Sequence, residues 1–265
     1  GYDGDRIEPA KELAAHEDLD YLVFECLAER TIANAQRRKI EDTGPGYSPL
    51  LESRIQAVLE DAKSNDIRII SNMGAASPQA AAKKVIQVAV DLDVSNLTVA
   101  GVFGSNVTDE FRKFQEYTFA DDPIEKYEDS CISANAYLGV NGILKALQSD
   151  ANVILTGRVA DPSLFLAPMI YEHEWDLDTV DSDLIGQGIA CAHLMECAGQ
   201  VTGGYYADPG YKNVDELSNL GFPIAEVSQD GDVVITKLPN TGGKVTANTA
   251  REQILYEVHD PSEYL

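Results

Sequence analysis

Apolar segments of strand length alternate with helix-forming segments through most of the chain, and this alternation most restricts the possible folds. The predicted strands cover residues 20–25, 67–71, 97–103 and 152–156. The helix-forming segments cover residues 8–16, 27–40, 50–62, 78–92 and 141–148. Strands that alternate with helices favour a parallel sheet with helices on both faces. The sequence therefore predicts an α/β fold with a doubly wound, mostly parallel sheet flanked by helices.

The C-terminal segment follows a different pattern. Residues 224–227 and 232–237 flank a turn-forming segment, which predicts a β-hairpin. The Thr249-x-x-Glu252 spacing then predicts a capping box for a last helix. We therefore expect the C-terminal segment to contain a β-hairpin and a helix.

The domain organisation follows from these two patterns. We expect an α/β core domain over residues 1–220, with the hairpin and helix of residues 221–265 packed on the same domain. The chain starts at Gly1 rather than at a methionine, and no terminating signal precedes Leu265. We therefore expect both ends to be truncated relative to the full-length protein.

The charge balance limits the partners. The chain carries 44 acidic and 20 basic residues, a net charge of −24. Such an acidic surface repels nucleic acid and anionic membranes. No apolar run approaches the roughly 20 residues that span a bilayer, and the four cysteines contain no CxxC pair, as in intracellular proteins with free thiols. These features predict a cytoplasmic protein that binds neither nucleic acid nor membrane.

Polar residues or glycines follow each predicted strand. Ligands of open parallel sheets bind beyond the carboxyl ends of the strands. The residues at those ends here are Glu25 and Cys26, residues 71–74, residues 103–106, and Gly157 and Arg158 with Asp161. The sequence therefore predicts a polar crevice at this edge of the sheet.

Two acids and two arginines at this edge are the candidates for chemistry. Glu25 is a candidate general base, Arg30 a ligand for a substrate carboxylate, and Arg158 a ligand for a carboxylate or enolate. Asp161 would move a proton or orient Arg158. Two structural alternatives stay open: an Arg–Glu pair tying the helix of residues 27–40 to its neighbours, and Asp161 as the N-cap of a helix that starts at Pro162.

Several further residues are candidates for substrate binding. We expect Asn72 and the Gly74 backbone to donate hydrogen bonds to an oxyanion, and Gly157 to permit a close approach. Gly203 and Gly204, followed by two tyrosines, would line a pocket or form a packed turn.

Metal binding is the weaker interpretation. His193, Glu196 and Cys197 share one helical face, but a second cluster of ligands is not evident, and a packed histidine is the commoner case. A Mg²⁺ site would need distant acids to meet, namely Asp3, Asp5, Glu25 and Asp161. We therefore expect no metal, and the sequence names no cofactor.

A nucleotide site is the other alternative. Gly1 and Gly4, a helix, a strand and Glu25 occur in the order of a dinucleotide site, but the glycine spacing is wrong, and Asp3 and Asp5 would repel a pyrophosphate. The segment 241–244 holds two glycines and a lysine without the full P-loop spacing. Neither glycine segment makes a convincing phosphate site.

Several longer strings together resemble one protein family. They are residues 4–9, 20–31, 72–75, 157–163, 200–205 and 221–226. In these strings the chain is similar to the acyclic terpene utilisation protein AtuA family over nearly its whole length. The resemblance implies a role in bacterial catabolism of citronellol and geraniol, beside CoA-linked enzymes. It also implies a glycine-rich strand before Gly1 and a continuation beyond Leu265, often to a small ferredoxin-like domain.

The functional expectation combines this resemblance with the strand-end residues. The resemblance implies a lyase, and we expect one of the C–C or hydratase type that acts on a branched acyl-CoA or carboxylate substrate. The strand-end positions, rather than the resemblance, make Glu25, Arg158 and Asp161 the candidate catalytic residues. The alternative is a non-catalytic α/β subunit that positions or stabilises a partner enzyme of the same pathway. We expect a homo-oligomer or an association with a small partner subunit or domain.

Overall fold

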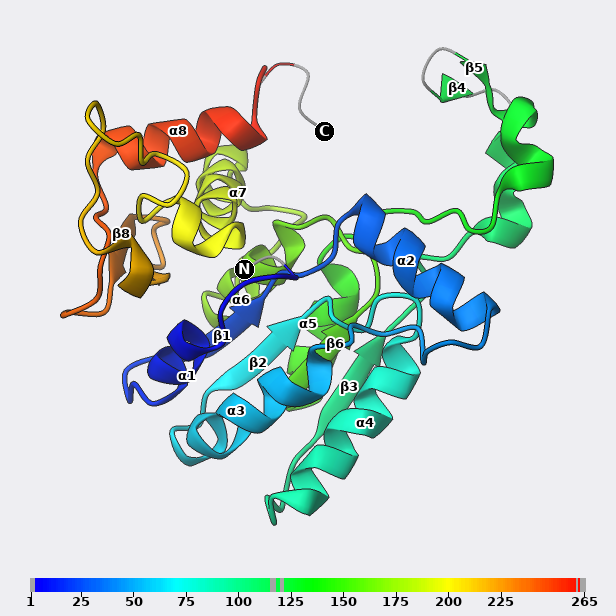
Figure 1. The fold of residues 1–265 in the computed structure, drawn as a ribbon, viewed down its shortest axis with the longest axis horizontal. Coiled ribbons are helices and arrows are strands. Elements are labelled where there is room, and N and C mark those ends of the chain that lie inside the picture. Colours follow the sequence, from blue (N-terminus) through cyan, green and yellow to red (C-terminus); the bar gives the residue numbers. More distant parts are fainter. Residues whose placement is uncertain (1–2, 115–117, 120–121, 261, 263–265) are drawn as a thin grey trace.

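One four-stranded parallel sheet organises the described part of the chain (Figure 1). The computed structural model describes residues 3–114, 118–119, 122–260 and 262. The strands are β1 (Tyr21–Phe24), β2 (Arg68–Ser71), β3 (Val99–Val102) and β6 (Val153–Thr156). They lie in the order β1-β2-β6-β3, and every neighbouring pair is parallel. The predicted parallel α/β sheet is confirmed.

Helices cover both faces of the sheet. One face carries α1 (Glu8–Ala14), α3 (Leu51–Ser64) and α4 (Pro78–Asp91). The other carries α5 (Asn141–Gln148) and α6 (Ser163–Glu172), with α7 (Ser182–Glu196) packed against α6. Helix α2 (Glu29–Ile40) lies near the carboxyl ends of the strands (Figure 1). This arrangement confirms the doubly wound fold.

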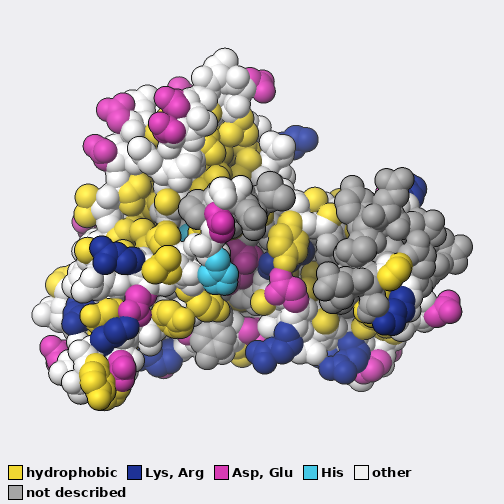
Figure 2. Space-filling view, turned by 90° about the horizontal axis from the view of Figure 1, so that it is seen from above, with side chains coloured by type: hydrophobic (Ala, Val, Ile, Leu, Met, Phe, Trp, Pro, Cys, Tyr) yellow, Lys and Arg dark blue, Asp and Glu magenta, His cyan; other side chains and the backbone are white. Residues whose placement is uncertain are grey.

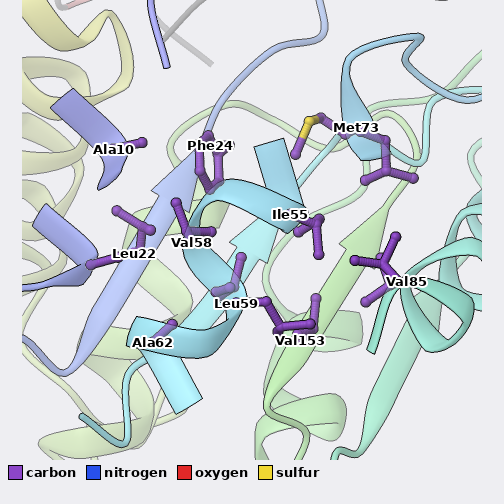
Figure 3. Close-up of a cluster of buried hydrophobic side chains, with 14 of the residues drawn as sticks. Ala10, Leu22, Phe24, Ile55, Val58, Leu59, Ala62, Met73, Val85 and Val153 are labelled. Atoms are coloured by element: carbon purple, nitrogen blue, oxygen red, sulfur yellow. The ribbon is translucent and has the colours of Figure 1, made fainter. Parts of the chain in front are cut away.

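The core explains the composition of the central strands. All four residues of β6 are buried, because helices cover it on both sides, and a strand of this kind needs no polar alternation. Val153 and Leu155 join the cluster under α3 and α4, whereas Ile154 packs on the opposite side. Figure 3 shows the first cluster, in which Ile55 and Val85 come from the covering helices.

The C-terminal segment packs on this same core. Strands β7 (Pro223–Val227) and β8 (Val233–Lys237) form the expected antiparallel hairpin. Side chains of the hairpin contact both core clusters, and α8 (Ala247–Glu257) packs on α7. The predicted capping box is wrong in register. Thr246 and Thr249 form it, while Glu252 pairs with Lys212.

The remaining elements are short. They are η1 (Thr108–Phe114), β4 (Thr118–Phe119), β5 (Asp122–Pro123), η2 (Ile124–Ser130), η3 (Ala198–Gln200) and η4 (Leu217–Asn219). The first four extend away from the sheet in Figure 1. Among the described residues, no helix is long and apolar enough to cross a membrane.

The helices that follow β2 and β6 lie on opposite faces of the sheet. The chain leaves β2 for α4 on one face, and it leaves β6 for α6 on the opposite face. The carboxyl ends of these two strands therefore flank a topological switch point, the place where ligands of open α/β sheets usually bind.

Two glycines close this switch point. A Cβ atom added to Gly74 would lie 2.4 Å from the carbonyl oxygen of Thr156, and one added to Gly157 would lie 2.9 Å from that of Ala75. The loops after β2 and β6 thus touch backbone to backbone. A ligand at this edge would therefore bind beside the backbone contact rather than between the two loops.

We predict that Gly74→Ala destabilises the protein, because its new methyl group meets backbone atoms on a neighbouring strand. Overpacking of this kind costs about 1–3 kcal/mol of unfolding free energy. The matched control is Gly186→Ala in α7, where an added Cβ meets nothing within 4 Å. This control should gain about 0.4–1 kcal/mol. Urea unfolding of both variants measures the difference, and equal stabilities would refute the close approach.

Candidate functional site

Polar side chains that follow β1, β2 and β6 lie at the carboxyl edge of the sheet. Figure 2 looks at the molecule from above, where acidic side chains and a histidine lie near the middle of the face, between hydrophobic areas. The residues that follow β3 are engaged elsewhere, since Ser105 and Asn106 contact Asn135 of a neighbouring loop. The site is therefore built on three strand ends, with helices α7 and α8 beside them.

Asn72 ties the end of β1 to the end of β2. Its fully buried side chain accepts a hydrogen bond from the Cys26 backbone N–H at 2.7 Å and donates one to Glu25 Oε1 at 2.9 Å. The backbone N–H of Leu27 donates to the same Glu25 oxygen at 2.9 Å. Asn72 therefore orients Glu25 with one of its two amide hydrogens.

Arg158 is a buried cation at the exit of β6. Its side chain is 4% exposed, and its Nη1 donates to the carbonyl of Leu27 and to Asp161 Oδ1, the latter at 2.9 Å. Its Nη2 lies 3.4 Å from Glu29 Oε1, on the first turn of α2. The guanidinium also stacks 4.1 Å from the ring centre of Tyr137, whose hydroxyl donates to Glu29. Arg158 thus holds three segments together.

Asp161 is not the helix cap that its position suggested. Pro162 occupies the N-cap position of α6, and no side chain caps that helix. The Asp161 carboxylate turns instead toward Arg158, three residues earlier, because the buried guanidinium attracts it more strongly than backbone N–H groups do. Its side chain is 31% exposed, so it is the member of this pair that a ligand can reach.

The electrostatic environment raises the pKa of Asp161 to about 7. Burial is the main cause, and the nearby Glu25 carboxylate adds to it, while Arg158 acts in the opposite direction. A carboxyl group with such a pKa exchanges its proton near neutral pH, which is what general acid–base catalysis requires. Perturbed groups of this kind are concentrated at functional sites.

A second group of polar side chains lies where α7 and α8 end. His193 Nδ1 is 2.7 Å from Glu196 Oε1, and both side chains are buried. Glu257, the last residue of α8, completes a triad in which one ligand atom of each residue lies within 4.8 Å of the others. The carboxylate of Glu257 accepts from Gln253 at 3.1 Å and from the Cys197 thiol at 3.2 Å.

The two groups of acids influence one another. Burial, Glu257, Asp161 and Glu25 together raise the pKa of Glu196 to about 10. We call Glu25, Asp161, Glu196 and Glu257 the acid cluster. Neighbouring carboxylates disfavour ionisation of Asp161 and Glu196, and Arg158 opposes this effect at Asp161. The cluster therefore relieves its charge by retaining protons, above all on Glu196.

Sequence reasoning missed Glu257 and Tyr137. Both reach the site from segments distant along the chain, through packing of α8 on α7 and through the loop before α5. The His193-x-x-Glu196 spacing was the sequence signal for the group that Glu257 joins.

The other predicted residues lie around the cluster without joining its hydrogen bonds. Arg30 is exposed on the first turn of α2, one residue after Glu29. The N–H groups of Gly203 and Gly204 donate to the carbonyls of Gln200 and Gly199, so they form a packed turn. Gly204 also lines a cavity of about 210 Å³, together with Cys197 and Gln200.

The alternative phosphate sites find little support in the geometry. Gly1 lies outside the described residues. The backbone N–H groups of Gly242, Gly243 and Lys244 all donate to carbonyl oxygens of the protein, at 2.7–2.9 Å. They are therefore not presented to a phosphate.

An apolar cavity of about 420 Å³ lies between β1, α6 and β7. Its lining includes Leu22, Phe165, Met169 and Ile224. Met195 and Ala198 also line it, and they flank Glu196 and Cys197 along the chain. Arg158 does not line this cavity, but the cavity shares a wall with the segment that carries Glu196.

Comparison with known proteins identifies one family. A family model described as "Acyclic terpene utilisation family protein AtuA" matches residues 1–265, the whole chain. No curated protein and no solved structure matches the chain significantly.

We predict that Asp161→Asn changes the pH dependence of stability. Because the folded pKa of Asp161 lies above its unfolded value, wild-type folding retains a proton that the unfolded chain releases. The contribution of Asp161 to wild-type stability therefore falls as pH rises from about 4 to about 7. The stability of the variant relative to wild type should rise over that window and then level off. Urea unfolding between pH 4 and 8 measures this, and a constant difference would contradict the raised pKa.

Proposed function

Because this chain belongs to the acyclic terpene utilisation family AtuA, we propose that it is a catabolic lyase, of the C–C or hydratase type. Family membership assigns it a role in acyclic terpene utilisation. Its substrate would be a branched acyl-CoA or carboxylate. The observation that carries the proposal is Asp161, a partly exposed carboxyl group with a pKa of about 7 at the end of a parallel strand.

A lyase of either type needs a group that moves a proton beside a leaving group. In a dehydration, a base takes the proton next to the carbonyl, and the hydroxyl group leaves as water after it gains a proton. In a retro-aldol cleavage, a base takes the hydroxyl proton, and a carbonyl group forms as the adjacent C–C bond breaks. The electrons of that bond leave the acyl fragment as an enolate, which then takes up a proton. Asp161 is poised for proton transfer near neutral pH, and Glu25 is a second carboxyl group held in a fixed orientation.

The two arginines have different roles in this proposal. Arg158 is enclosed by Leu27, Glu29 and Asp161, so it positions Asp161 and stabilises its charged form. Arg30 is exposed at the rim, where it would attract a carboxylate or the phosphates of CoA. The assignment of substrate binding thus shifts from Arg158 toward Arg30.

The apolar cavity supports a branched hydrocarbon substrate. Most of its lining is aliphatic or aromatic, although Asp20, Glu172 and His173 also line it. Such a lining suits an apolar chain, and the volume lies in the range of small-molecule sites. The wall that it shares with the segment carrying Glu196 would bring such a chain beside the acid cluster.

A non-catalytic subunit is the second candidate. The ion pairs of Arg158 with Glu29 and Asp161 favour this candidate, because a guanidinium that already contacts two protein carboxylates needs no ligand to balance its charge. In that case the chain would position a partner enzyme of the same pathway. Under either proposal we expect a cytoplasmic protein that binds neither nucleic acid nor membrane and associates with copies of itself or with a small partner subunit or domain.

The lyase proposal predicts that Asp161→Asn lowers kcat by about 100-fold or more. The assay incubates purified protein with branched acyl-CoA thioesters and the matching free acids, and mass spectrometry follows the products. Asn retains the oxygen that accepts from Arg158, so the ion network loses only its charge. Asp150→Asn is the matched control. Asp150 also forms an ion pair, with Arg68, but it precedes β6 and therefore lies at the opposite end of the sheet from Asp161.

The outcomes separate the candidates. Turnover that is lost in the Asp161 variant and kept in the Asp150 variant supports the proposal. Unchanged turnover in the Asp161 variant refutes the role of Asp161. If the wild type turns over neither substrate class, the result favours the non-catalytic subunit.

A further inference from the structure

The ends of α7 and α8 bring one imidazole and two carboxylates together in the protein interior. We propose that His193, Glu196 and Glu257 bind a divalent transition-metal ion, with Zn²⁺ as the best match. One ligand atom from each residue lies within 4.8 Å of the other two. Ligands at zinc distances stand about 3.4 Å apart around a tetrahedral ion. Small side-chain rotations would therefore close the site.

The backbone already sets up this arrangement. His193 and Glu196 are three residues apart on the last turn of α7, so they face the same direction. Gln253 on α8 donates from one amide nitrogen to the carbonyl of His193 and to Glu257 Oε1, each at 3.1 Å. It is 1% exposed. Gln253 therefore fixes α8 to α7 and holds Glu257 at the triad, as residues around metal ligands commonly do.

One oxygen in this triad has no hydrogen-bond partner among the residues that the structure describes. Glu196 is 3% exposed, and its Oε2 accepts no hydrogen bond from any described residue. A buried carboxylate oxygen without a donor or a cation is strongly unfavourable. Arg158, the buried cation of the carboxyl edge, donates to Leu27, Asp161 and Glu29 instead. A bound cation would satisfy the oxygen and replace the proton that Glu196 otherwise retains.

The donor set selects the class of ion. Mg²⁺ and Ca²⁺ prefer oxygen ligands alone, whereas an imidazole nitrogen with carboxylates suits Zn²⁺ and related ions. Three protein ligands leave a coordination position open, as in catalytic zinc sites. The neighbouring Cys197 thiol donates to Glu257, so it supports a ligand rather than acting as one.

This proposal departs from our expectation of no metal. That expectation rested on the lack of further ligands near His193 and Glu196, and Glu257 provides the missing one from the C-terminal helix. The metal site does not depend on the lyase proposal, because binding is measured without substrate. The two proposals can therefore fail separately.

Titration calorimetry with Zn²⁺ alone tests the site. The chain is first stripped with a chelator and kept at physiological ionic strength, which weakens loose binding to the acidic surface. We expect one tight site per chain. Glu196→Gln and Glu257→Gln should each lower the affinity at least about 100-fold. Glu252→Gln, on the same helix and paired with Lys212, is the matched control and should bind like wild type.

Co²⁺ provides an independent readout, since visible absorption bands report the ligands around it. These bands should appear with wild type and disappear with Glu196→Gln. Gln has the shape of Glu, and melting curves in the absence of metal check that each variant folds. If Glu196→Gln does not fold, Glu257→Gln decides the question.

Two results would overturn the proposal. One is the absence of a single tight site in folded wild type, which would mean that the two carboxyl groups share a proton instead. The other is equal affinity in wild type and in the Glu196 and Glu257 variants, which would place the bound ions on the acidic surface.

Discussion

Arg158 brings a buried positive charge to the point where the chain leaves β6, and the arrangement of the carboxyl edge depends on it. Through one side chain it holds the loop after β1 by the carbonyl of Leu27, the start of α2 by Glu29, and the start of α6 by Asp161. A guanidinium suits this position because it offers several donors in fixed directions. Without it, the three segments would carry carboxylates toward each other with nothing between them.

Burial and hydrogen bonding, more than this charge, account for how unequal the acids around it are. Glu29 lies in solvent and hydrogen-bonds to Tyr137, so its pKa is lowered. Asp161 lies deeper and near Glu25, and its pKa is raised although Arg158 touches it. Glu196 is the most buried of the three and lies beside Glu257, so its pKa rises furthest. Burial, hydrogen bonding and neighbouring charges thus separate the pKa values of three carboxyl groups of similar intrinsic acidity.

The fold could be predicted from the sequence because its signals are local. The apolar run at 152–156 is buried on both faces in β6, and turn residues separate it from its helices. The rule that ligands bind beyond strand ends also found Glu25, Asn72, Arg158 and Asp161. The partners of these residues could not be found, since Tyr137 and Glu257 come from distant segments. The alternative of Asp161 as a helix cap was wrong for a related reason, because a buried charge three residues away outweighs a local capping preference.

Gln253 gives the C-terminal helix a significance beyond packing. One amide nitrogen reaches both a backbone carbonyl of α7 and the Glu257 carboxylate, so Glu257 stays beside His193 and Glu196 only while α8 is docked. Helix ends are the parts of a fold that fray first. The occupancy of this triad is therefore coupled to the opening and closing of the last helical turn, and hydrogen exchange at residues 253–257 would follow the lifetime of the assembled site.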